Sequence, residues 1–355
     1  MSKKNKHNLL LLLSSMIFGA FDDTRSFAAP AYTGSVTDHF NGETFFNQVN
    51  SDKGFIDIVK FGLPFSFVKE TWPDWIDSTP KKIPHKRLSG DSVSVTFINH
   101  STLLIQVDGV NILTDPIFTQ RASFYSWIGP KRVRNPGVNL NDLPPIDIIL
   151  VSHNHYDHLD IETLKLISAN NPKDQPPLIL SGLGNGQLFD DNALKNHKDF
   201  DWEQSVLHKG LEIVFTESRH RTGRGITDQM KTLWGSFVIK TRLGNIYFAG
   251  DTGYGPHFKD ARLRHGNFIL SLLPIGAYEP RWFMQTAHLN PADAVKAHLD
   301  LESRQSIGIH FGTFQLTYEG IDQPIIDLEK ALRENQISDT DFIVPEFGET
   351  RLLKF

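Results

Sequence analysis

The sequence predicts a fold of the α/β class, and three observations support this expectation. Short apolar runs typical of strands alternate along the chain with segments of helical spacing. Polar residues recur at the positions where these apolar runs end. The chain of 355 residues is long enough to bury a sizeable core, and its 39% hydrophobic and 22% charged residues are ordinary for a globular protein.

Charge and cysteine content exclude several classes of function. The formal net charge is -5, and basic residues are concentrated only in the first few positions. This gives no electrostatic case for a nucleic-acid partner. The sequence holds no cysteine, which excludes disulfides and a lipid-anchored lipoprotein.

The N-terminus is typical of a secretory leader. Lysines within the first six residues precede the leucines of 9–13, and the apolar character ends at Phe21, too short for the roughly 20 residues of a membrane span. Ser26 and Ala28 supply small side chains at the positions that a signal peptidase reads, so we expect cleavage after Ala28, with Ala29 and Ala31 as alternatives. Export to a bacterial periplasm follows from this expectation. The alternative is a leader that stays uncleaved and anchors the protein to the membrane.

We therefore expect three parts in the chain: a signal peptide over 1–28, an N-terminal extension over 29–90 and a main domain over 91–355. The extension mixes aromatic residues with prolines, which is typical of an irregular segment packed on a core. A lid or an apolar wall for a functional site is the alternative interpretation.

The main domain begins with a predicted hairpin. Apolar residues alternate from Val93 to Phe97, and two further β-runs flank Asp108-Gly109, a strong two-residue turn signal. Asn290 before Pro291 is a predicted helix N-cap. The later elements are expected as strands at 146–151, 178–180, 211–216, 233–240, 245–249, 268–273 and 306–309, and as helices at 161–169, 291–299 and 325–332.

The strongest chemical signal is the stretch His153-Asn154-His155-Tyr156-Asp157-His158. It follows the apolar run 146–151, so three imidazoles and a carboxylate fall within six residues at a strand end. A loop in that position can direct all four side chains to one point. Histidine nitrogen and aspartate oxygen are ligands that suit zinc. We predict a metal site, whereas the alternative is a polar turn rich in histidine.

Three later residues share this position after a strand. They are His220, Asp251 and His310. Each alone has an ordinary explanation, such as an Asx turn at Asp251. Together with the first motif they supply enough ligands for two metal ions. His100 and Asp115 also lie at strand ends, where either a role in orienting a ligand or simple turn chemistry explains them.

The loop over 118–136 combines aromatic residues with arginine and lysine. This composition suits an anionic amphiphile and predicts peripheral contact with a membrane. An ordinary solvated loop explains it as well.

Several long motifs resemble one family. The metal-ligand series resembles that of the metallo-β-lactamase superfamily, and within it the chain is similar to the N-acylphosphatidylethanolamine-hydrolysing phospholipases D, from about Val95 to Leu353. The motifs that carry this similarity are 113–118, 121–123, 129–132, 143–147, 152–160, 233–236, 248–254, 274–284 and 309–314.

The resemblance implies a four-layer αββα sandwich with a dinuclear zinc centre at one edge of its sheets. It implies a first zinc held by His153, His155 and His220. It implies a second zinc held by Asp157, His158 and His310, with Asp251 as the bridging ligand.

For the substrate, the resemblance places His288 near the phosphate. It places Tyr278, Trp282, Phe283 and Met284 around an apolar cavity for acyl chains, although an aromatic cluster is more often simple core. The chain departs from the animal enzymes in its leader and in 221–225, where glycines and extra arginines suggest a different rim.

The function implied is hydrolysis of a phosphodiester bond in a glycerophospholipid by a hydroxide held between two Zn²⁺ ions. Asp251, Asp157 and His288 are the predicted catalytic residues. A lactonase or another hydrolase of the same fold is the alternative, since fold does not fix substrate. A third interpretation is a non-catalytic metal-binding protein. It is disfavoured because no ligand of the series is missing from the sequence.

Overall fold

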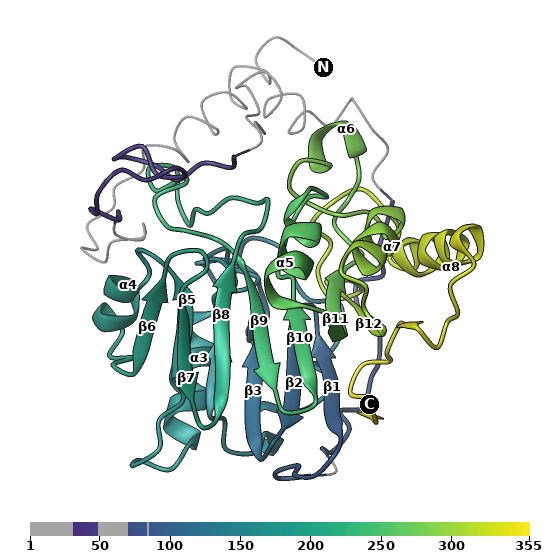
Figure 1. The fold of residues 1–355 in the computed structure, drawn as a ribbon, viewed down its shortest axis with the longest axis horizontal. Coiled ribbons are helices and arrows are strands. Elements are labelled where there is room, and N and C mark those ends of the chain that lie inside the picture. Colours follow the sequence, from purple (N-terminus) through teal and green to yellow (C-terminus); the bar gives the residue numbers. More distant parts are fainter. Residues whose placement is uncertain (1–30, 49–69, 84) are drawn as a thin grey trace, which may run out of the picture.

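The computed structural model describes residues 31–48, 70–83 and 85–355. Two seven-stranded sheets lie face to face, and helices cover both outer faces (Figure 1). This confirms the predicted four-layer αββα sandwich. The predicted signal peptide and residues 29–30, 49–69 and 84 of the predicted extension lie outside the described residues.

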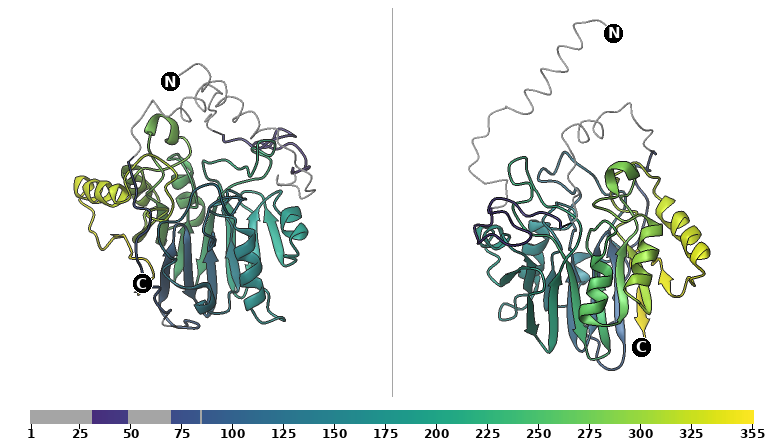
Figure 2. Two further views of the ribbon diagram at one scale, coloured as in Figure 1. Left: turned by 180° about the vertical axis from the view of Figure 1, so that it is seen from behind. Right: turned by 45° about the horizontal axis from the view of Figure 1, so that its top comes forward.

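The first sheet has the order β14-β1-β2-β3-β4-β5-β6 and lies in front when the molecule is seen from behind (Figure 2, left). It is antiparallel from β14 to β3 and parallel from β3 to β6. Its strands are β14 (Thr350–Leu353), β1 (Val93–Asn99), β2 (Thr102–Val107), β3 (Val110–Thr114), β4 (Ile148–Leu150), β5 (Leu178–Gly182) and β6 (His197–Phe200). Its connections contain α3 (Ile161–Asn170), α4 (Gly186–Asp191) and the short 3₁₀ helix η1 (Leu140–Asp142).

The second sheet has the order β13-β12-β11-β10-β9-β8-β7. Its strands are β7 (Ser205–His208), β8 (Leu211–Thr216), β9 (Ser236–Thr241), β10 (Gly244–Phe248), β11 (Phe268–Pro274), β12 (Gln305–Ile309) and β13 (Phe342–Ile343). Its helices are α5 (His257–His265), α6 (Arg281–Met284), α7 (Pro291–Asp300) and α8 (Gln323–Asn335). As expected, Asn290 caps α7 by accepting a hydrogen bond from the backbone N–H of Asp293.

The predicted β2–β3 hairpin is confirmed. Asp108 and Gly109 both have positive φ, at 51° and 79°, which suits the right-handed twist of a two-residue hairpin. Every residue of β1 is buried, including the polar residues that alternate with Val93, Val95 and Phe97. A sheet packed on both faces explains this burial. On β3, Ile112 belongs to the core between the sheets, whereas Leu113 belongs to the core with α3.

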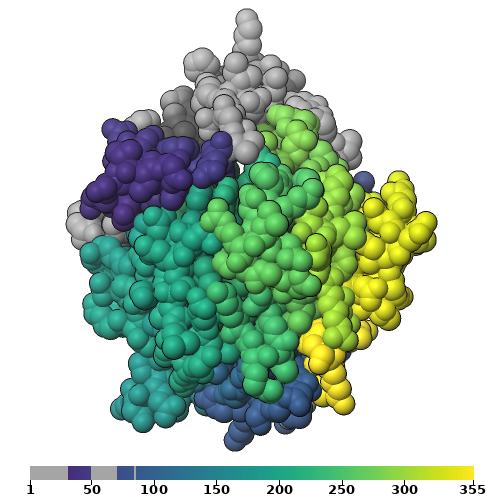
Figure 3. Space-filling model, in the orientation of Figure 1, coloured from purple at the N-terminus to yellow at the C-terminus, as the bar shows by residue number. Residues whose placement is uncertain are grey.

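Residues 31–48, purple in Figure 3, lie over the loop between β8 and β9, where the N–H groups of Tyr32 and Phe45 donate to the carbonyls of Lys231 and Met230. Phe40 and Phe45 are 0% and 1% exposed and belong to the same buried hydrophobic cluster as the strands of the second sheet. His39 packs its ring on Trp202 with the ring centroids 4.4 Å apart. Among the described residues, no helix is both long and apolar enough to span a bilayer.

The main disagreement in boundaries has a structural cause. The strand predicted over 233–240 begins at Ser236. The residues before it bond across to the other sheet's loops, because the N–H groups of Leu233 and Gly235 donate to the carbonyls of Leu183 and Ser152. These contacts bring the segment before β9 against the loops that follow β4 and β5.

Candidate metal centre

Loops that follow parallel strands build the site. His153 lies three residues after β4, Asp251 three after β10, and His310 directly after β12. Gly250 allows the close approach of two of these loops, since it has a φ of 58° and a Cβ at this position would collide with the side chain of Ser152. Strand ends from both sheets therefore meet at one edge of the sandwich.

The first group of nitrogens comes from His153, His155 and His220, whose candidate ligand atoms lie within 4.8 Å of one another. Nε2 of His220 is 3.2 Å from Nδ1 of His155. The second ring nitrogens of His220 and His153 each lie within hydrogen-bonding distance of another group. Nδ1 of His220 is 2.9 Å from the Ala287 carbonyl, and Nδ1 of His153 is 2.9 Å from Oγ of Ser152.

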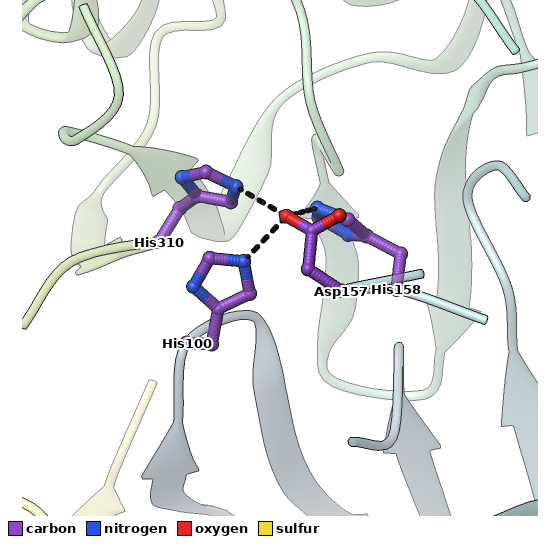
Figure 4. Close-up of side chains that lie close together, drawn as sticks. All are labelled: His100, Asp157, His158 and His310. Carbon is purple, nitrogen blue, oxygen red and sulfur yellow. Dashed lines mark hydrogen bonds and ion pairs between the residues drawn. The ribbon is translucent and has the colours of Figure 1, made fainter. Parts of the chain in front are cut away.

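The second group is centred on Asp157 (Figure 4). Its Oδ2 lies 3.3 Å from Nε2 of His158 and 3.5 Å from Nε2 of His310. The same oxygen lies 2.9 Å from Nε2 of His100. These four side chains form one cluster of candidate ligand atoms.

Asp251 lies between the two groups. One of its oxygens is 3.2 Å from Nε2 of His310, and the other is 3.3 Å from Nε2 of His158. The second oxygen is also 3.9 Å from His220 and 4.0 Å from His153. Asp251 is thus the carboxylate that reaches both groups, as expected of a bridging ligand.

The donor atoms fit divalent metal ions. Nε2 of His153, His158 and His310 and Oδ1 of Asp251 are buried and lack a hydrogen-bond partner within the described parts of the chain. Buried polar atoms in folded proteins are almost always paired, so a convergent set without partners indicates ligands. Imidazole nitrogen and carboxylate oxygen together suit zinc and related divalent metals.

The protonation of the site supports this. Burial and three neighbouring imidazoles hold the pKa of His153 well below its ordinary value, so its nitrogen is available as a ligand. Burial also opposes the charge on His310, but Asp251 and Asp157 outweigh it and raise its pKa to about 9. Protons therefore offset the buried carboxylates in the metal-free protein, and a bound cation has to replace them.

Asp115 orients one of the candidate ligands. Its position in the sequence leaves open whether it has this role or only shapes a turn, and its contacts favour the first. Its carboxylate accepts hydrogen bonds from the backbone N–H and hydroxyl of Ser152, at 2.7 and 2.6 Å. It also lies 2.6 Å from Nδ1 of His158. This contact leaves Nε2 of His158 facing the metal cluster.

The composition of 221–225 predicts a rim of the site, but Arg224 lies beneath the His-rich loop of residues 153–158. Its guanidinium donates to the carbonyls of Asn154 and Leu159, at 2.9 and 2.8 Å, and lies 3.9 Å over the Tyr156 ring. It therefore fixes both ends of the His-rich loop. The sequence holds no local signal for this role, because the partners are backbone carbonyls 65 to 70 residues away.

A cavity of about 180 Å³ opens onto the metal cluster, lined among others by Asp251, Arg221, Phe283, Met284 and His288. Nδ1 of His288 lies 3.7 Å from Oδ2 of Asp251. Phe283 and Met284 supply apolar surface in the lining of this cavity.

Two predicted wall residues do not line this cavity. Tyr278 is turned toward α8, where its hydroxyl donates to Asp327 at 2.6 Å. Trp282 lies next to Phe283 on α6 but is 40% exposed.

The fold and the His/Asp cluster at its strand ends define a hydrolase of the metallo-β-lactamase class. Residues 110–311 match the model of the β-lactamase superfamily domain. The chain belongs to this superfamily, which confirms the resemblance and implies bound metal ions.

Among its relatives is the N-acyl-phosphatidylethanolamine-hydrolyzing phospholipase D 1 of Caenorhabditis elegans, 33% identical over 344 residues that cover 92% of this chain and 94% of that protein. The mitochondrial enzyme of the same name from Saccharomyces cerevisiae is 36% identical over 263 residues, 72% of this chain and 55% of that protein.

Solved structures agree on the fold. A metallo hydrolase from the archaeon Ignicoccus hospitalis has a TM-score of 0.53 at 21% identity, with 74% of this chain and 99% of that chain covered. An isothiocyanate hydrolase from Delia radicum gut bacteria has a TM-score of 0.56 at 20% identity, with 74% and 99% covered. At these identities the likeness shows the fold alone.

Proposed function

We propose that this hydrolase holds two Zn²⁺ ions and cleaves the phosphodiester bond of an N-acylphosphatidylethanolamine, releasing phosphatidic acid and an N-acylethanolamine. One arrangement carries the proposal. Asp251 lies between two groups of ligands at a cavity that also holds the cation of Arg221 and the apolar side chains of Phe283 and Met284.

The metal ions, when bound, would lower the pKa of water toward neutrality and offset the charge that develops on the phosphoryl oxygens. Asp251 would set the separation of the two ligand groups, since it lies within 4.0 Å of His153, His158, His220 and His310. Asp157 would keep the second group in place through its contacts with His158 and His310.

Arg221 would bind the phosphate. Its side chain makes no hydrogen bond or ion pair with any described residue, although burial lowers the pKa of its guanidinium. A half-buried cation without a partner beside a ligand cluster is suited to an anionic substrate. His288 lies on the same cavity wall and would position a phosphoryl oxygen or the leaving oxygen.

The cavity supports a lipid better than a small polar lactone. Phe283, Met284 and Leu316 line it next to the charged groups, so one substrate region meets apolar surface while another meets Arg221. The two relatives named above carry phospholipase D names, which supports the same substrate class.

The test is hydrolysis of N-acylphosphatidylethanolamine by the zinc-loaded chain, with the two products quantified. Asp251→Asn should abolish turnover, and Arg221→Met should raise KM for the phospholipid because it removes the charge and keeps the aliphatic stem. Hydrolysis of a lactone and of a soluble phosphodiester is measured in parallel. Turnover of either of these without turnover of the phospholipid would overturn the lipid assignment.

We also propose that the loop over 118–136 approaches the membrane that holds the substrate. Phe124, Trp127 and Ile128 are 47%, 71% and 46% exposed on this loop. The loop is joined to the site, since Arg132 lies 5.3 Å over the ring of Phe314, which packs on His100. Trp127→Ser should reduce co-sedimentation with liposomes, and unchanged sedimentation would contradict the contact.

Export by the leader completes the proposal. Fractionation of the producing cells should find the chain outside the cytoplasm with its N-terminus at residue 29. A cytoplasmic chain of full length would contradict export, and a full-length chain in the membrane fraction would favour the uncleaved anchor.

A further inference from the structure

A second and larger cavity is lined by Phe311 and Gly312, the two residues that follow His310. Its volume is about 690 Å³, within the range of small-molecule sites. It lies beside α8, the yellow helix at the edge of the sandwich in Figure 1. None of the residues that line it belongs to the candidate metal ligands.

Most of the wall is apolar. Helix α8 contributes Ile325, Leu328 and Leu332 to it, and β13 contributes Phe342 and Ile343. The floor is formed by Phe311 and Phe347, whose ring centroids are 6.0 Å apart. An alkyl chain would find hydrocarbon on three sides here.

One cation in this cavity lacks a partner. The guanidinium of Arg134 lies 4.2 Å over the Phe347 ring. Its Nε is buried without a hydrogen-bond partner, and no carboxylate of the described residues lies within 4.0 Å of the group. Burial lowers the pKa of Arg134, an effect that Asp322 only partly offsets. Charges taken out of water are normally paired, so this site favours an anion.

The other lining cations are already neutralised. Lys81 pairs with Glu346 at 2.8 Å, and Arg351 pairs with Glu349 at 2.5 Å. Asp322 and Asp339 add negative charge to the lining. One unpaired guanidinium among these acids suits a single negative charge and disfavours a dianionic phosphate, because the second charge would meet repulsion.

We propose that this cavity binds a long-chain fatty acid, with the carboxylate on Arg134 and the alkyl chain between α8 and β13. The ligand would touch Phe311 and Gly312, which directly follow the candidate metal ligand His310. The segment with Arg134 is tied to the same loop, since the N–H of Val133 donates to the Thr313 carbonyl at 3.0 Å.

The test is calorimetric titration of the zinc-loaded full chain with palmitate, beside acetate and hexadecanol. Palmitate should bind with a stoichiometry of one, whereas acetate lacks the chain and hexadecanol lacks the charge, so both should bind far more weakly. Arg134→Met should weaken palmitate binding roughly ten- to hundredfold, the range for a lost hydrogen bond to a charged group.

Two matched variants make the result decisive. Lys330→Met removes an exposed cation from α8, and neither Lys330 nor its partner Glu334 lines the cavity. Arg221→Met removes the unpaired arginine of the metal-site cavity. Both variants should leave palmitate binding unchanged. Ile325→Trp keeps Arg134 and fills the cavity, and it should also weaken binding. Three results would each overturn the proposal. The first is wild-type affinity for palmitate in both Arg134→Met and Ile325→Trp, and the second is loss of palmitate binding in Arg221→Met. The third is an affinity of the wild type for hexadecanol equal to its affinity for palmitate.

Discussion

Nδ1 of His158 lies 2.6 Å from Oδ2 of Asp115, so a carboxylate that follows β3 holds a candidate metal ligand that follows β4. The two strands are parallel neighbours, which places both residues at the same edge of the sheet. The contact sets the orientation of the imidazole and makes Nε2 the nitrogen available to a metal.

Asp115→Asn should therefore weaken binding of the second metal ion roughly ten- to hundredfold. An amide removes the negative charge and presents Nδ1 of His158 with a weaker partner. Competition with a zinc chelator measures the two affinities separately. Asp160→Asn is the control: Asp160 is a buried acid that caps α3 and contacts no candidate ligand. It should cost stability and leave zinc affinity unchanged; a similar loss in both variants would contradict a specific role of Asp115.

His100 should position Asp157 in the same way. Burial lowers the pKa of His100 to about 3, so its ring is neutral at neutral pH, with one N–H to donate to Asp157. His100→Phe keeps the ring beside His310, now 3.9 Å away between centroids, and removes the donor. We expect weaker binding of one zinc ion, with partial recovery in His100→Gln, as measured by zinc stoichiometry after dialysis against a chelator. Two tightly held ions in His100→Phe would contradict the role.

Much of this centre follows from the sequence alone. His153 to His158 form a dense local motif, and His220, Asp251 and His310 each follow an apolar strand, so position and residue type suffice to group them. The supports are harder to predict. Asp115 and His100 occupy strand ends where turn chemistry is an equal explanation, and only the pairing of β3 with β4 decides for Asp115.

Parts of the fold also follow from local sequence, whereas other parts depend on tertiary contacts. Strands with continuous apolar runs, such as β11, and the helix capped by Asn290 follow from local pattern. Helix α5 has the sequence HFKDARLRH, which contains few apolar residues, and it is stabilised by Phe258 and Ala261 in the core instead. The resemblance predicts Tyr278 in the wall of the substrate cavity, but its hydroxyl donates to Asp327 on α8, 49 residues away, and this contact determines its direction.

Binding of the metal ions should release protons. In the metal-free protein Asp251 and Asp157 raise the pKa of His310 to about 9 against the effect of burial, so this imidazole is protonated at neutral pH and must lose its proton to become a ligand. Zinc affinity should accordingly rise as the pH rises from 6 to 8. Titration of zinc in two buffers with different ionisation enthalpies counts the protons released, and a heat that is independent of the buffer would contradict the prediction.

Removal of the metal ions should also destabilise the fold. The buried nitrogens and oxygens of the cluster then lack their cations, and a ligand at 100 times its dissociation constant contributes roughly 2.7 kcal/mol to stability. The midpoint of thermal unfolding should fall by several degrees after chelation and recover on addition of zinc. Asp251→Asn should show a smaller fall than the wild type, because it has less metal affinity to lose. An equal Tm with and without chelator would contradict a bound metal in the wild-type chain.

His39 should make the attachment of residues 31–48 dependent on pH. Its ring nitrogens lie 2.6 Å from Asp38 and 2.6 Å from Asp201, the second of which belongs to the main domain. Burial opposes its charge, but the hydrogen bonds to Asp201 and Asp38 outweigh burial and raise its pKa above 6.5. A group whose pKa is raised on folding stabilises the protein fully below its unfolded pKa, and this contribution is lost as the pH rises through the folded value.

His39→Phe keeps the aromatic contact with Trp202 and removes the charge. The free energy of unfolding should therefore differ between wild type and variant by about 1 kcal/mol at pH 6, the upper value for a partly exposed ion pair, and the difference should shrink toward pH 9. Urea unfolding at several pH values measures it. His208→Phe is the matched control: burial lowers the pKa of this half-exposed histidine, so its contribution should change in the opposite direction. A difference for His39→Phe that stays constant from pH 6 to 9 would show that packing on Trp202, and not the charge on His39, holds this segment in place.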